Sequence, residues 1–577
     1  MRELFKGMLK GIKDSLKRFP QTIVISTACV VILIYISEIT PGVNGDFIES
    51  LVRVAMVIAL GVPLSLCINL FFERAEDYKK VSVYASYLIG AVLLILYFYF
   101  FLMDIKMVSM SRYVGLSLIL YLVFLFISYL PNRDDFEFYV IKVFTRFFTT
   151  VLYSLVLYLG LAAILFTIDK LLGINIRSEL YYYTWLIVAG IFAPSFFLAG
   201  VKAKNETLSL NDYSRLLNVL VLYIIMPLIS IYTIILYIYF AKIIITRQWP
   251  EGLVSNLVIW YSALSACVLF FITPLLNEKA WTKRYMKYFP KVILPLIAMM
   301  FISIGIRIRA YGVTENRYFV VALGIWVFVI MIYFASAKKL RNIILPISLA
   351  AITFISVFGP FSSYSVSKYS QNKRLNNIFV RNNMISDNKV IKASTEVTGE
   401  DARQISSILN YFDSKHSLKD VEKLPQDFTI SGLESILGVK YTGDTNEYFS
   451  FNSSNVLRTI DIKGYDYLFN SVDNGPLNSN NTIFSIDFDY ELSTLNITQD
   501  GNNIYKKDLQ AFANKLIDKY GVNQNQQNIS SEEMSFVDEN DKVKIKIQFS
   551  NLSGSMDNSN GKTGSNNFQF YVLVKVK

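Results

Sequence analysis

Long apolar segments alternate with short polar ones over the first two thirds of the chain and then stop. Uncharged or nearly uncharged runs of roughly 17–25 residues recur up to about Pro360, and each is long enough to cross a ~30 Å hydrocarbon core as a helix. This pattern predicts about eleven transmembrane helices within residues 21–361. Their expected ranges are 21–38, 51–72, 82–102, 112–130, 147–168, 181–201, 216–241, 255–276, 291–307, 318–337 and 343–361.

Beyond this block the spacing of the apolar positions changes. Residues 362–384 are polar, follow a helix stop at Gly359-Pro360 and predict a helical stalk. Within residues 385–577, "TGEDARQISSILNYFDSKH" has a helical apolar face, whereas "IFSIDFDYEL", "KVKIKIQFS" and "FQFYVLVKVK" alternate as strands do, and "QDGNN" predicts a hairpin turn. The predicted fold class is an all-α polytopic membrane bundle of about eleven transmembrane helices, followed by an extracytoplasmic α+β domain with an antiparallel sheet.

The first twenty residues fit neither part. Apolar residues such as Leu4, Ile12 and Leu16 fall at helical spacing opposite a series of lysines. We expect residues 1–20 to form a basic amphipathic helix on the cytoplasmic face of the membrane. No small-x-small cleavage site follows the first apolar run, so we interpret this run as an uncleaved span.

Net charge divides the chain at the same place. The 577 residues carry a net charge of +11, of which residues 1–367 contribute +14 and residues 368–577 contribute −3. Basic residues gather in every second connection, such as "ERAEDYKK" and "NEKAWTKRYMKYFPK", which the positive-inside rule assigns to the cytoplasm. With eleven spans, the N-terminus is then cytoplasmic and the C-terminal domain is outside. The basic balance therefore gives no reason to expect a nucleic-acid partner.

The predicted exported domain contains no cysteine. Exported domains that fold without disulfides are typical of a bacterial envelope that does not depend on oxidative folding. We therefore expect a multi-pass protein of a bacterial plasma membrane.

One connection, "RIRAYGVTENRY", carries far more charge than its apolar neighbours. By the predicted topology it faces outward, where the positive-inside bias disfavours arginine. In one interpretation Arg307, Arg309 and Arg317 anchor the helix ends at lipid phosphates, with Glu315 neutralising one of them. In the other, these residues and Tyr318 line an outward-facing vestibule and bind an anionic headgroup or a carboxylate.

The sequence lacks the usual constellations of catalytic or metal-binding residues. The only histidine, His416, ends a predicted surface helix, and we interpret it as a solvated residue rather than a ligand or base. Asp487, Asp489 and Glu491 alternate along one strand, which favours a solvated sheet face over a Ca²⁺ site. No Asp, Glu or His falls in the middle of a span, which argues against proton-coupled transport. We predict neither a metal nor a cofactor.

Four motifs together resemble a known family. They are "RFP", "YGVTENRY", "GPFSSYSVSKYSQNKRL" and "IDIKGYDYL", and they are similar to the bacterial multi-pass membrane proteins grouped as family 4153 of the domains of unknown function. The resemblance implies a helical membrane block with an exported tail, and it implies no established activity. The motif residues that we single out are Tyr311, Gly312, Thr314, Gly359, Pro360, Ser367, Gln371 and Arg374.

Two functions stay open at this point. The favoured one is a non-enzymatic role in envelope-ligand binding, sensing or transport, with membrane lipids and an anionic or lipid-linked envelope component as partners. The alternative is a membrane enzyme that acts on a lipid-linked sugar or phosphate, with a glycosyltransferase-like layout. Such an enzyme needs a catalytic carboxylate in its first outer loop, where this chain offers only Asp46 and Glu49 within about a dozen residues.

Overall fold

The computed structural model divides the chain into two compact units, residues 1–377 with 412–422 and residues 378–411 with 423–577. We call them the membrane unit and the second unit. The structure describes residues 2–39, 45–74, 80–130, 135–172, 174–202, 208, 213–247, 253–276, 278–387, 389–442, 446–453, 460–471, 484–489, 493–521, 527–557, 562–563 and 567–577.

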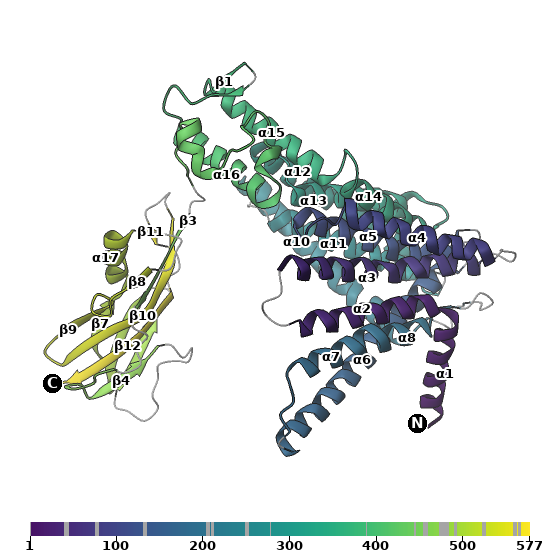
Figure 1. The fold of residues 1–577 in the computed structure, drawn as a ribbon, viewed down its shortest axis with the longest axis horizontal. Helices are drawn as coiled ribbons and strands as arrows, with labels where there is room; N and C mark the ends of the chain where they lie inside the picture. The colour runs from purple at the N-terminus through teal and green to yellow at the C-terminus, as the bar shows by residue number, and fades with distance from the viewer. Residues whose placement is uncertain are drawn as a thin grey trace. The chain divides into compact units, whose positions relative to one another are not determined.

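The membrane unit is built from helices (Figure 1). Its α-helices are α1 (Arg2–Arg18), α2 (Pro20–Glu38), α3 (Gly45–Glu73), α4 (Lys80–Phe100), α5 (Met107–Phe126), α6 (Phe136–Leu172), α7 (Glu179–Ile187), α8 (Ala193–Leu198), α9 (Arg215–Val219), α10 (Met226–Thr246), α11 (Leu253–Ile272), α12 (Ala280–Tyr311), α13 (Glu315–Ser336), α14 (Ile344–Val357) and most of α15 (Ser363–Arg381). Short 3₁₀ segments extend two of them, η1 (Ile127–Tyr129) after α5 and η5 (Thr273–Leu275) after α11.

Within the described residues, ten helical segments are long and apolar enough to cross a membrane. This confirms the predicted polytopic helical bundle. The eleventh predicted span, residues 343–361, contains the apolar helix α14, which has only 14 residues. A helix of this length is shorter than the ~20 residues that a simple membrane crossing needs.

Two of the ten segments pass through a π-helical turn directly before a proline. The turn η2 (Val188–Phe192) joins α7 to α8 next to Pro194, and η4 (Leu220–Ile225) joins α9 to α10 next to Pro227. Proline donates no backbone hydrogen bond, and a π turn accommodates the altered pattern without ending the helix.

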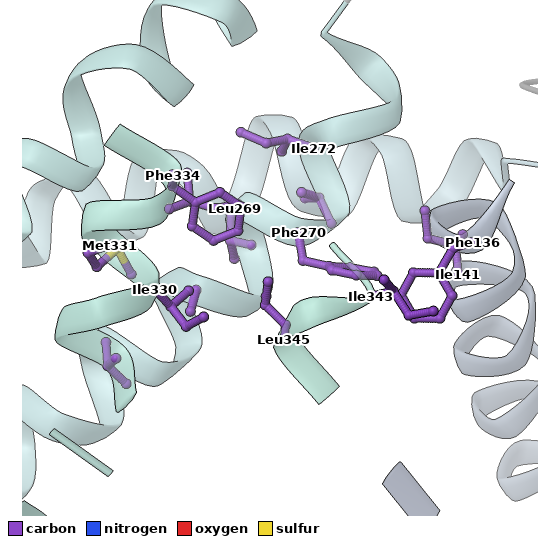
Figure 2. Packing of buried hydrophobic residues seen from close by; sticks show 14 of the residues in the cluster. Phe136, Ile141, Leu269, Phe270, Ile272, Ile330, Met331, Phe334, Ile343 and Leu345 are labelled. Carbon is purple, nitrogen blue, oxygen red and sulfur yellow. The ribbon is translucent and has the colours of Figure 1, made fainter. Parts of the chain in front are cut away.

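The largest apolar core of the membrane unit gathers around α11, α12 and α13. Figure 2 shows Phe334 of α13 beside Leu269 of α11, and Phe270 directed toward Phe136 of α6 and Ile343. The rings of Phe136 and Phe270 meet edge to face with centroids 6.0 Å apart. The three free cysteines also lie in membrane helices, in α2, α3 and α11.

The second unit combines antiparallel sheets with two helices, α16 (Gly399–Lys415), which it shares with the membrane unit, and α17 (Gln510–Tyr520). Its strands are β1 (Ile385–Ser386), β2 (Lys389–Val390), β3 (Asn446–Ser453), β4 (Tyr467–Asn470), β5 (Phe484–Asp489), β6 (Thr494–Gln499), β7 (Asn502–Asp508), β8 (Gln527–Ile529), β9 (Ser535–Glu539), β10 (Val543–Asp557), β11 (Lys562–Thr563) and β12 (Asn567–Val576). Short helical turns lie at Leu418–Asp420, Ile430–Gly432 and Leu433–Leu437, the first of them in the membrane unit.

The larger sheet has the order β4-β12-β10-β3-β8, with β9 and β11 also paired to β10, and the smaller sheet has the order β5-β6-β7. Pairing is antiparallel throughout these described strands except between β3 and β8. The predicted "QDGNN" turn joins β6 to β7, with positive φ at Asp500 and Gly501 as a type I′ hairpin requires. The predicted α+β fold is therefore confirmed.

The acidic residues considered for Ca²⁺ lie at β5. Asp487 is exposed and Asp489 is half-buried, whereas Glu491 lies outside the described residues. In the described parts of the chain, no group of three His, Cys, Asp or Glu side chains is arranged to hold a metal ion.

Candidate functional site

The connection between α12 and α13 is short and sharply bent. Gly312 ends α12 with a φ of +71°, a region that favours glycine because a Cβ atom would be strained there. A Cβ at this position would also lie 2.9 Å from Nε2 of Gln371 and 3.1 Å from Oγ of Ser370. Thr314 has extended backbone angles and precedes the first turn of α13. Gly312 therefore permits both the bend and the close approach of α15.

Helix α15 holds this connection with side-chain hydrogen bonds. Nε2 of Gln371 donates to the carbonyl oxygens of Tyr311 (3.1 Å) and Val313 (3.0 Å), and the backbone N–H of Val313 donates to Oγ of Ser370 (2.9 Å). Gln371 is buried, so the loss of these bonds would leave a desolvated amide without its partners. The connection is thus fixed by α15 rather than by its own residues.

Two arginines gather around Tyr311, and a third lies near one of them. Arg317 donates to the carbonyl oxygens of Tyr311 (3.2 Å) and Gly312 (2.7 Å), and Arg374 also donates to Tyr311 (3.2 Å). Both guanidinium groups lie near the Tyr311 ring, 5.6 Å and 5.9 Å from its centroid. Arg307 is close enough to act on Arg317 as a like charge, as is Arg374. We call Arg307, Arg317 and Arg374 the arginine cluster.

The arginine cluster is partly shielded from water. All three residues are half-buried, and burial lowers the pKa of the Arg374 guanidinium from its ordinary value. Like charges in a partly desolvated place repel one another more strongly than they do in water. An oxyanion at this position would relieve that repulsion and accept charge-assisted hydrogen bonds.

The buried residue Glu315 has a partner that the sequence analysis missed. Its Oε1 lies 2.7 Å from Nε2 of His416, and each side chain is only 3% exposed. The prediction that His416 is a solvated helix-end residue is therefore wrong. Its side chain lies in the membrane unit beside the Phe412 ring, because residues 412–422 pack with that unit.

Further contacts attach residues 412–422 to α15. Nζ of Lys368 lies 3.1 Å from a carboxylate oxygen of Asp420, and Asn372 bonds to the backbone of Asp420 and Glu422. No pattern in the sequence indicated these contacts, and for the Glu315–His416 contact the only signal was the rarity of histidine in the chain.

The other residues that the sequence analysis singled out lie near the α12–α13 connection but are not part of the arginine cluster. The Tyr318 hydroxyl donates to the carbonyl oxygen of Phe361 (2.6 Å), and Arg309 is exposed on α12. Gly359 has a φ of +81° just before Pro360, where the chain turns into α15. Ser367 is fully buried, and its hydroxyl has no hydrogen-bond partner within the described ranges.

The motifs that build this connection lie within a match to a protein-family model. The model is described as "Domain of unknown function (DUF4153)", and it matches residues 23–390. The chain belongs to this family. The DUF4153 region includes α2 to α15, so it contains the α12–α13 connection and all three arginines of the cluster.

A curated protein is similar to this chain over a comparable number of residues. "Uncharacterized protein PM1469" of Pasteurella multocida (strain Pm70) is 23% identical over 408 residues, which are 70% of this chain and 66% of that protein. No solved structure matches the chain. Neither the description of the DUF4153 family nor the name of this relative states an activity.

Proposed function

We propose that this protein is an integral plasma-membrane protein that binds an oxyanion, phosphate or carboxylate, of an envelope ligand at the α12–α13 connection. The observation that supports the proposal is the convergence of Arg317 and Arg374 on Tyr311, with Arg307 near Arg317. Guanidinium groups present planar pairs of donors that match phosphate and carboxylate oxygens. A cluster of like charges held by a rigid connection is arranged for such a ligand in advance.

The contacts of the nearby acidic residue favour this proposal over a self-neutralised cluster. Glu315 is the acid nearest to the arginines in sequence, and one of its carboxylate oxygens bonds to His416. The hydrogen bonds of Arg317 go to backbone carbonyl oxygens, which carry no net charge. The three guanidinium groups of the cluster also outnumber this one carboxylate.

The direction in which the site faces is part of the proposal. Basic residues gather in every second connection, which supports a cytoplasmic N-terminus and an outward-facing α12–α13 connection. Gln371 of α15 bonds to this connection, which supports a chain that is back on the same side after α14 and a second unit outside the membrane. The ligand would then come from the outer leaflet or from the envelope. In this arrangement the protein acts in ligand binding, sensing or transport.

The enzyme alternative stays a prediction. The same guanidinium groups would suit the diphosphate of a lipid-linked sugar, and the catalytic carboxylate would be Asp46 or Glu49 at the start of α3. No observation favours this reading over ligand binding.

Native mass spectrometry of the protein in nanodiscs tests the proposal. One set of discs contains phosphatidylglycerol, and a second contains only phosphatidylcholine with inorganic phosphate added. The variants Arg317→Gln and Arg374→Gln are expected to reduce anion retention about tenfold, the effect of losing one charge-assisted hydrogen bond. Retention only in the first set identifies a lipid headgroup, and retention in the second identifies a soluble oxyanion.

Arg247→Gln is the matched control. Arg247 is an exposed arginine at the end of α10, outside the cluster, and by the predicted topology it lies on the same side of the membrane. Its substitution should leave retention unchanged. Equal loss in Arg247→Gln and in Arg317→Gln, or no retained anion in the unmodified protein, would overturn the proposal.

A further inference from the structure

The membrane unit contains a large cavity that is separate from the arginine cluster. Its volume is about 910 Å³, and its walls come from α2, α3, α5, α6, α7, η2 and α8. Pockets of ~300–1,000 Å³ enclose a whole small molecule in soluble proteins. Nearly all of the lining side chains are apolar, with phenylalanine, valine and leucine predominating.

The cavity is elongated along α6. Its lining on this helix runs from Val140 to Tyr158, which corresponds to about 27 Å at 1.5 Å per residue. One leaflet of a ~30 Å hydrocarbon core is about half as deep. The cavity therefore has the length and the chemistry to hold an extended hydrocarbon chain.

The walls of the cavity reach the outer surface of the helical bundle. Phe147, Val151 and Leu155 of α6 line it and are each about half exposed, as is Trp185 of α7. In a membrane these side chains contact lipid chains, because the helices that carry them are apolar enough to span the bilayer. A lipid chain can thus enter from the side.

One end of the cavity lies where several helices begin or end together. Thr22 is near the start of α2, Leu125 near the end of α5, Val140 near the start of α6, and Leu198 at the end of α8. Helix ends of this kind lie at the level of the lipid headgroups. The opposite wall, at Tyr158 and Trp185, lies deeper along the helices.

A half-buried cation, Arg146, lies at the headgroup end of the cavity. Arg146 does not itself line the cavity, but it lies in the α6 sequence between the lining residues Val143 and Phe147. Its guanidinium donates twice to the carbonyl oxygen of Phe196. Its guanidinium carbon lies 3.9 Å from the centroid of the Phe196 ring. Gly200 leaves room for it, since a Cβ there would lie 2.3 Å from Nε of Arg146.

Arg146 has no acidic partner in the part of the chain that the structure describes. No carboxylate forms an ion pair with it among the residues that the structure describes. A charged side chain at the end of a membrane helix is costly unless it meets an opposite charge, water or a ligand, and such residues commonly mark binding sites. Arg146, for which the described residues provide no carboxylate partner, lies beside a cavity shaped for a hydrocarbon chain.

We infer that the cavity binds one anionic membrane phospholipid, with an acyl chain between α6 and the α2–α3–α5 wall and its phosphate on Arg146. The phosphate supplies the counter-charge that the described residues do not give Arg146, and the chain fills the apolar volume. This inference does not depend on the proposed oxyanion site, because no residue is shared between the two. The ligand differs from the surrounding lipid in its fixed position and in its requirement for an anionic headgroup.

Photocrosslinking in nanodiscs tests the inference. The probes are phosphatidylglycerol and phosphatidylcholine that carry the same diazirine group in one acyl chain. The expected result is strong labelling of α6 and α7 peptides by phosphatidylglycerol, and about tenfold less after Arg146→Gln, with recovery in Arg146→Lys. Equal labelling by both lipids would overturn the role of Arg146.

A cavity-filling variant gives a second, independent readout. Ala189 lines the cavity, so Ala189→Trp should abolish the phosphatidylglycerol labelling of α6 while the protein remains folded. Ala163→Trp is the matched control, because Ala163 is exposed on α6 and is not part of the lining. Labelling that survives Ala189→Trp, or that falls equally in Ala163→Trp, would mean that the probe reports only the surrounding lipid. Arg317→Gln should not change this labelling, which separates failure here from failure of the proposed function.

Discussion

The α6–α7 and α12–α13 helix pairs are similar in the length and hydropathy of their first helices and very different in environment. Helices α6 and α12 have 37 and 32 residues, and both contain a long apolar run. Within the most apolar 18-residue window, none of α6 is buried inside the protein, whereas 44% of α12 is. Figure 1 shows α12 among α13 and its neighbours, while α6 and α7 pair at the side of the bundle. Hydrophobicity alone therefore does not tell a lipid-facing helix from a packed one.

The connections of the two pairs differ in the same way. At the start of α7, Arg177 pairs with Glu38 at 3.2 Å, with side chains 63% and 43% exposed. At the start of α13, Glu315 pairs with His416 at 2.7 Å, with both side chains 3% exposed. Burial rather than distance distinguishes the two pairs, because solvent screens the first and not the second. This contrast predicts a large difference in their contributions to stability.

The largest expected effect is the loss of the buried pair. Glu315→Ala should reduce the free energy of unfolding by about 3–5 kcal/mol, because it leaves His416 desolvated and without this partner. Glu38→Ala, at the exposed pair, should change stability very little. Thermal unfolding of the purified protein in one detergent compares the two variants directly.

A double variant tests whether the loss of stability comes from the interaction between Glu315 and His416. If the interaction with His416 causes the loss, Glu315→Ala combined with His416→Ala should be no less stable than Glu315→Ala alone. Additive losses would instead mean that each residue acts through other contacts, and the comparison of the two connections would fail.

The second prediction compares leucines in the bodies of the helices. Leu296 of α12 is 1% exposed and Leu159 of α6 is 56% exposed. Leu296→Ala should cost about 2 kcal/mol, the low end of the range for buried leucine, because lipid also solvates the leucine when the helices separate. Leu159→Ala should have almost no effect on the unfolding temperature. A similar loss at both positions would show that α6 is packed against protein after all.

The third prediction concerns glycines near the end of α12. Gly312→Ala should destabilise the protein by about 1–3 kcal/mol, because its φ is positive and the new Cβ meets Gln371. Gly305→Ala is the control about two turns earlier, where a Cβ meets no atom within 4 Å. In that helical position alanine should stabilise by up to ~1 kcal/mol. The two glycines thus predict opposite signs, measured again by thermal unfolding.

Much of the fold follows from the sequence, because single elements carry clear signals. Apolar runs identified the membrane helices, and "QDGNN" identified the β6–β7 turn. The length of helix α14 was overestimated, because its flanking residues are apolar without being helical. Local patterns suffice where the structure depends on neighbours in the chain.

The candidate site was less accessible to sequence reasoning. The charge of "RIRAYGVTENRY" indicated Arg307 and Arg317, and the resemblance indicated Gln371 and Arg374, which the structure brings to the same connection. The contact of His416 with Glu315 spans 101 residues, and no periodic pattern links them. The cavity beside Arg146 was also missed, since lipid-facing and cavity-lining side chains are equally apolar.

The smallest predicted effect concerns the attachment of α6 to its neighbours. Gly200→Ala would place a Cβ 2.3 Å from Nε of Arg146, so the arginine must move away from Phe196. An arginine side chain is flexible, and the expected cost is therefore only about 1 kcal/mol. Gly160→Ala on α6, where a Cβ meets nothing within 4 Å, should be neutral or stabilising in the same thermal unfolding assay. If Gly200→Ala were also neutral, the contact between Arg146 and Phe196 would add little to the attachment of α6, and the cavity beside it would be free to widen. A measurable loss of stability would instead identify Arg146 as the residue that fixes this otherwise lipid-facing helix to α8.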